Sequence, residues 1–117
     1  MEITNLDSLV EFSPEKYVRV PIKGTEGLVR LLCFEPHQTV PLHKHPDADE
    51  IFYVIRGEGE ITVDAEHANV SQGCLVRAPA DVSHCWKNGE KQLVLVSFLI
   101  FPSNYELAEH IARMELV

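Results

Sequence analysis

The segment His43-Lys44-His45-Pro46-Asp47-Ala48-Asp49-Glu50, together with His84 about thirty residues further on, decides how this chain is expected to fold. His43 and His45 are two residues apart, and residues two apart in a strand project from the same face. The polar turn after His45 is long enough to reverse the chain, so Glu50 would begin a second strand beside the histidine pair. His84 would join them from a third strand if the sheet closes on itself. The spacing therefore predicts one metal site.

The proposed ligands are three imidazoles and one carboxylate, from His43, His45, Glu50 and His84. Such donors suit a single divalent transition metal ion: Fe, Mn, Zn, Ni, Co or Cu. Four protein ligands on an octahedral ion leave two positions open, whereas structural zinc sites are usually closed and rich in cysteine. A purely structural ion is one alternative interpretation, and ordinary surface or core histidines are another. His67 and His110 lie in polar or terminal stretches and are expected to be solvated.

The same residues resemble the two sequence motifs of the cupin superfamily. The first motif appears as His43-x-His45, four residues, Glu50, six residues and Gly57; the second appears as Gly73, five residues, Pro79, four residues, His84, three residues and Asn88. The resemblance implies an all-β, antiparallel jelly-roll (double-stranded β-helix) barrel. At 117 residues the chain suits a single barrel domain spanning residues 1–117.

Two positions depart from the motif pattern. His37 stands where the first motif usually opens with glycine, and it is expected to add an imidazole near the barrel mouth. Asp81 stands where the second motif usually has a glycine after Pro79. Because aspartate tolerates left-handed backbone angles, Asp81 is expected to adopt the turn that the glycine would have formed.

Short strand-like segments alternate with Gly, Pro, Asn and Asp along the chain, which is typical of an antiparallel sandwich or barrel. Strands are predicted at residues 17–22, 28–34, 40–45, 50–56, 60–64, 74–78, 84–87 and 92–101. A short helical turn is expected near Leu6. Ser103 and Glu106 form a capping box before an apolar helical face, which predicts a C-terminal α-helix over about 104–116, packed outside the barrel.

Parity along the strands predicts which side chains line the pocket. Phe52 and Val54 share the parity of Glu50, and Trp86 shares the parity of His84, so these three side chains and His37 are the possible pocket residues. Alternatively, Trp86 is an ordinary residue of the hydrophobic core. No catalytic residue beyond the ligands is identified.

Composition narrows the classes of partner. The net charge of −8 and ten scattered basic residues argue against nucleic acid. The longest apolar stretch, residues 93–101, contains Ser97 and is too short to span a membrane. The first seven residues show no secretory signal, and three cysteines without short spacing favour a reducing, cytoplasmic location. Strands 51–55 and 93–98 are apolar on both parities, which predicts a homodimer or, alternatively, burial under the terminal helix.

Three functions are compatible with the sequence. The first is a small metal-dependent enzyme of dioxygenase, decarboxylase or isomerase/epimerase type, acting on a small polar or carboxylate-bearing molecule; the resemblance permits each type and selects none. The second is a non-catalytic module that binds or senses a sugar or small acid through a metal-anchored ligand. The third, a structural or storage barrel, is the least favoured because the chain is small and its ligand set is intact.

Overall fold

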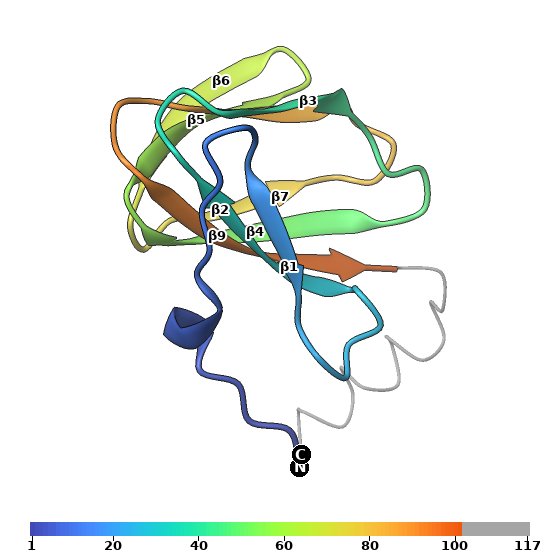
Figure 1. Ribbon diagram of the computed structural model, residues 1–117. Coiled ribbons are helices and arrows are strands. Elements are labelled where there is room, and N and C mark those ends of the chain that lie inside the picture. Colours follow the sequence, from blue (N-terminus) through green and yellow to red (C-terminus); the bar gives the residue numbers. More distant parts are fainter. Residues whose placement is uncertain (102–117) are drawn as a thin grey trace.

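The structure is a computed structural model that describes residues 1–101, and these form two facing β-sheets (Figure 1). One 3-10 turn, η1 (Leu6–Leu9), precedes the strands. The strands are β1 (Val18–Pro21), β2 (Val29–Phe34), β3 (Thr39–His43), β4 (Asp49–Arg56), β5 (Glu58–Val63), β6 (Glu66–Ser71), β7 (Leu75–Ala78), β8 (His84–Asn88) and β9 (Leu93–Ile100). The helix predicted at 104–116 lies outside the described residues.

The strand order confirms the predicted antiparallel jelly-roll. One sheet has the order β1-β2-β9-β4-β7 and the other β3-β8-β5-β6, and every recorded pairing is antiparallel. Neighbours such as β2 and β9 come from distant parts of the chain, so the sheets close around a common interior. Side chains that are far apart in the sequence therefore meet between the sheets.

Strand β6 was not among the predicted strands. It is the outer strand of its sheet, and Glu66 to Asn69 are exposed on both faces. An exposed edge strand lacks the alternation of apolar and polar residues by which strands are recognised. It pairs with β5 through a two-residue turn at Asp64 and Ala65, and Asp64 adopts a φ of 55°. His67, on β6, is exposed as expected.

The main core lies between the sheets and is made by inward-facing residues of alternating parity. Its fully buried members include Phe34, Phe52, Val54, Trp86, Leu93 and Leu95. A second cluster covers the outer face of β1, β2 and part of β9, where the N-terminal residues around η1 pack on Leu31, Cys33 and Val94. Both faces of β2 are thereby covered.

The rest of that outer face carries exposed apolar side chains, beside the ion pair of Arg77 with Asp49. Tyr53 is 41% exposed, Leu75 68%, Phe98 37% and Ile100 51%. These side chains come from β4, β7 and β9, which are neighbours in one sheet. In residues 1–101, no helix is long and apolar enough to cross a membrane.

Gly57 fixes the tight connection between β4 and β5. Its φ is +88°, and a Cβ built there would lie 2.2 Å from the backbone oxygen of Gln92. A side chain at this position would therefore meet both an unfavourable backbone conformation and an immovable backbone atom.

We predict that Gly57→Ala lowers the free energy of unfolding by about 2–4 kcal/mol, because overpacking adds to the cost of a left-handed conformation. Gly73→Ala is the matched control: its φ is +93°, but nothing lies within 4 Å of the new Cβ, so the loss should be only about 1 kcal/mol. Urea unfolding of both variants measures the difference. Equal losses would show that the contact with Gln92 does not matter.

Candidate metal centre

Four side chains converge at one end of the barrel, each offering one ligand atom, and these atoms lie within 4.8 Å of one another. The residues are His43, His45, Glu50 and His84. His43 ends β3 and pairs in register with His84, the first residue of β8, while Glu50 comes from β4 in the facing sheet. The cluster therefore joins the two sheets.

His45 reaches the cluster by a different route from the one predicted. The strand expected over residues 40–45 ends at His43, so His45 belongs to the turn before β4. The turn is fixed instead by its backbone, since the His45 carbonyl accepts a hydrogen bond of 2.9 Å from the Asp81 N–H. His43 and His45 are therefore not brought together by the alternation of side chains along a single strand.

The distances between donor atoms suit a metal ion. Glu50 Oε1 lies 3.1 Å from His45 Nε2 and 3.0 Å from His84 Nε2. Two ligands each about 2.1 Å from an ion, at right angles, are about 3.0 Å apart. The carbonyl oxygen of Pro41 lies 2.7 Å from His43 Nδ1 and can only accept, so Nδ1 carries the proton and Nε2 keeps its lone pair for a ligand role. The four residues could thus hold a divalent ion.

Glu50 is buried but ionised. Burial by itself would raise the pKa of this carboxyl, but hydrogen bonds from His84 and Ser97 and the positive charge of Arg30 outweigh burial and lower the pKa to about 2. The Arg30 guanidinium donates to Oε2 at 2.7 Å, and the Ser97 hydroxyl donates to the same oxygen. One carboxylate oxygen is thereby held in place while the other faces the histidines.

Burial also lowers the pKa of His45, and the neighbouring His43, His84 and Arg30 lower it further against the opposing pull of Glu50. An imidazole with a lowered pKa is neutral at neutral pH, which is the form that binds a metal.

Arg30 and Ser97 were not identified from the sequence as site residues. Each is the one polar residue within an apolar strand, Arg30 in β2 and Ser97 in β9, and the two residues are register partners. A polar side chain on the inward face of such a strand needs a buried partner. That signal was visible in the sequence, although nothing in it named Glu50 as the partner.

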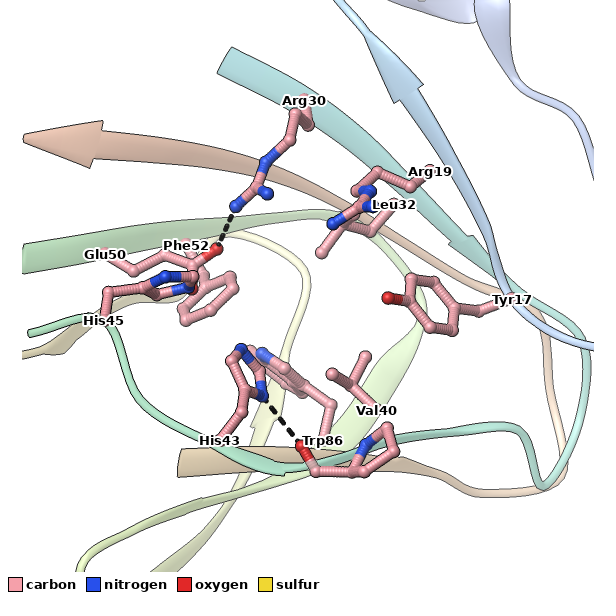
Figure 2. A pocket seen from close by; sticks show the side chains of 11 residues that line it. Tyr17, Arg19, Arg30, Leu32, Val40, His43, His45, Glu50, Phe52 and Trp86 are labelled. Atoms are coloured by element: carbon pink, nitrogen blue, oxygen red, sulfur yellow. Dashed lines mark hydrogen bonds and ion pairs between the residues drawn. The ribbon is translucent and has the colours of Figure 1, made fainter. Parts of the chain in front are cut away.

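A cavity of about 280 Å³ opens beside the cluster (Figure 2). Its lining consists of Tyr17, Arg19, Arg30, Leu32, Val40, Pro41, His43, His45, Glu50, Phe52 and Trp86. Phe52 and Trp86 thus lie on its wall, with ring centroids 5.2 Å apart. Val54 is buried in the core and is not part of the lining, and His37 lies against a separate hollow beside Glu58 and Lys87.

The two departures from the motif pattern share one backbone conformation. Asp81 has a φ of 62°, as expected, and His37 has a φ of 66°. Both residues therefore adopt the left-handed conformation that glycine accommodates most easily. The His37 N–H donates to the Gly89 carbonyl at 2.8 Å, so the contribution of this residue is a turn rather than an imidazole at the cavity.

Residues 30–101 match the cupin domain family, and this stretch contains all four converging side chains. The chain is a cupin. An uncharacterized protein of Aquifex aeolicus is 28% identical to it over 118 residues, an alignment that covers 98% of this chain and 94% of that protein.

Solved structures share the fold of this cupin. The TT1209 protein of Thermus thermophilus superposes with a TM-score of 0.81 at 28% identity, covering 86% of this chain and 98% of that one. A predicted oxalate decarboxylase of Thermotoga maritima superposes with a TM-score of 0.63 at 21% identity, covering 79% of this chain and 97% of that one. The second likeness extends to the fold alone.

We predict that the metal-free protein loses more stability on acidification than its Glu50→Gln variant does. The pKa of Glu50 is depressed in the folded state, so its stabilising contribution is full above the usual carboxyl value of 4.5 and is lost as the pH falls towards about 2. The wild type should lose up to about 3 kcal/mol more than the variant over that range. Denaturant unfolding at successive pH values measures this, and parallel pH profiles would contradict the prediction.

Proposed function

We propose that this cupin is a metal-dependent enzyme that acts on a small polar or carboxylate-bearing molecule. The observation that carries the proposal is the convergence of three imidazoles and one buried carboxylate at the edge of a cavity. Glu50 and His84 are buried, whereas His43 and His45 are only half-buried and border the open space. A small molecule could therefore reach an ion from the histidine side.

The proposed ligands are His43, His45, Glu50 and His84, and the proposed ion is one of Fe, Mn, Zn, Ni, Co or Cu. When bound, such an ion supplies Lewis-acid or oxygen-activating chemistry. The protein holds the Glu50 carboxylate charged through Arg30 and Ser97, and it keeps His43 in the tautomer that leaves Nε2 free. The dioxygenase, decarboxylase and isomerase or epimerase types all remain compatible with this site.

Apolar walls shape the space beside the ligands. Phe52 packs edge-on against both His84 and Trp86, with centroid distances of 5.7 and 5.2 Å. These rings limit the access of water on one side of the site and leave the opposite side to polar groups.

The alternative function is a non-catalytic module that binds a sugar or acid through the ion, and it would use the same walls. A turnover assay of metal-loaded protein separates this module from an enzyme.

We predict that the protein retains close to one metal ion per chain when purified without chelator or an immobilised-metal step, and that His43→Ala retains much less, because the loss of one imidazole ligand weakens binding of the ion. His67→Ala is the matched control, since His67 is exposed and lies outside the cluster. Elemental analysis measures the metal content per chain of the wild type and of both variants. Wild-type protein that stays empty after reconstitution would contradict the proposal.

We also propose a cytoplasmic homodimer. Cys33, Cys74 and Cys85 are free, which suits a reducing compartment. Exposed apolar side chains of β4, β7 and β9 lie on one outer face of the sheet, and a second copy of the chain is the proposed cover.

Leu75→Glu should therefore convert a dimer into a monomer, because it places a charge on the most exposed apolar side chain of this face. Leu42→Glu is the control: Leu42 is 64% exposed, close to the 68% of Leu75, but belongs to the other sheet. Light scattering after size exclusion measures the mass. A monomeric wild type would contradict the dimer and leave residues 102–117 as the candidate cover.

A further inference from the structure

The wall of the cavity formed by β1 and β2 carries polar groups that the metal site does not use. Arg19 on β1 is the register partner of Leu32 on β2, so both side chains project from the inner face of the sheet. Tyr17 precedes β1, and its ring stacks on Phe34 with a centroid distance of 5.2 Å. Figure 2 shows the Tyr17 hydroxyl and the Arg19 guanidinium pointing into the space beside His43 and His45.

These groups are hydrogen-bond donors without protein partners. Among residues 1–101, no carboxylate pairs with Arg19, and the Tyr17 hydroxyl makes no hydrogen bond. Because both groups face the cavity without a partner in the described part of the chain, a ligand that fills this space should supply acceptors.

The carboxylate oxygens of the lining and the backbone carbonyl of Pro41 already have partners. Glu50 is the one acidic residue of the lining, and its oxygens bind His45, His84, Arg30 and Ser97. The Pro41 carbonyl is taken by His43. Apart from the imidazole nitrogens proposed to bind the ion, the free polar groups of the lining are thus mainly donors, which favours a ligand with oxygen acceptors.

The charge of the cavity also favours a ligand with oxygen acceptors. Its lining contains two arginines and one glutamate, a net charge of +1 with neutral histidines, and a divalent ion would increase it. The whole chain carries −8, so its surface as a whole repels anions. A cationic pocket in an acidic protein selects a small anion locally.

Size limits the ligand further. The cavity measures about 280 Å³, close to the lower end of the roughly 300–1,000 Å³ range of small-molecule sites. Arg19 is an exposed residue of the lining, whereas Glu50 is buried and marks the place where the four converging side chains meet. A ligand that spans the cavity needs an anionic group at one end and a metal-binding oxygen group at the other.

We infer that Arg19 and Tyr17 form a carboxylate-binding subsite and that the substrate is a small organic acid with a second oxygen function. The Arg19 guanidinium offers paired N–H donors to the carboxylate, and the Tyr17 hydroxyl donates a third hydrogen bond. Arg30 has a separate role, since it holds Glu50. The inference rests on the proposed function only for the far end of the substrate, which would reach the ion.

The test uses malonate, succinate and glutarate as probes, with the neutral diamide malonamide as the uncharged counterpart, in calorimetric titrations of the full chain as purified. The tightest-binding dicarboxylate should bind at least about tenfold more tightly than malonamide. Arg19→Gln should lower its affinity by about tenfold, and Tyr17→Phe by several-fold, with the metal content unchanged. Arg56→Gln removes the same charge from an exposed position outside the cavity and should change nothing.

The inference is overturned if Arg19→Gln and wild type bind the dicarboxylates equally, if malonamide binds as tightly as the acids, or if none of the probes binds the wild type. Repeating the titrations on metal-free protein keeps the two proposals apart. Arg19-dependent binding of a dicarboxylate by protein that never holds a metal would support the subsite and contradict the proposed function. Metal retention together with dicarboxylate binding that does not depend on Arg19 would support the proposed function and contradict the subsite.

Discussion

The Glu50 carboxylate is the group on which the arrangement of this site depends. Its side chain is almost fully buried, and its two oxygens are held by partners from both sheets and from the turn before β4. A buried carboxylate that lost these partners would cost several kcal/mol, so the strands that supply them must meet in one register. The pairing of β2, β9 and β4 brings Arg30 and Ser97 to one oxygen, and β8 brings His84 to the other.

The same arrangement divides the barrel interior into regions with different chemistry. The apolar core, with Trp86 and Phe52 at its edge, excludes water beneath the ligands. The four converging side chains lie at the end of this core, and Tyr17 and Arg19 border the open side of the cavity. An ion and a small acid would then be held by separate groups of residues, so changes in ligand preference need not disturb the metal site.

Much of this could be predicted from the sequence, because the signals were local. His43, Glu50 and His84 have spacings that a closed antiparallel sheet brings together, and Phe52 and Trp86 follow from strand parity. The rest depended on features that spacing does not encode. Strand β6 is exposed on both faces and shows no alternation, His45 is placed by a backbone hydrogen bond in a turn, and the roles of Arg30, Ser97 and Arg19 depend on which strands become neighbours.

We propose that one ion binds where Glu50 meets the three histidines. X-ray absorption spectroscopy at the edge of the metal that the purified protein carries tests it most directly. We expect three imidazole nitrogens and at least one oxygen at about 2.0–2.2 Å, with no sulfur in the coordination shell. A sulfur ligand at about 2.3 Å, or a shell with fewer than three imidazoles, would contradict it.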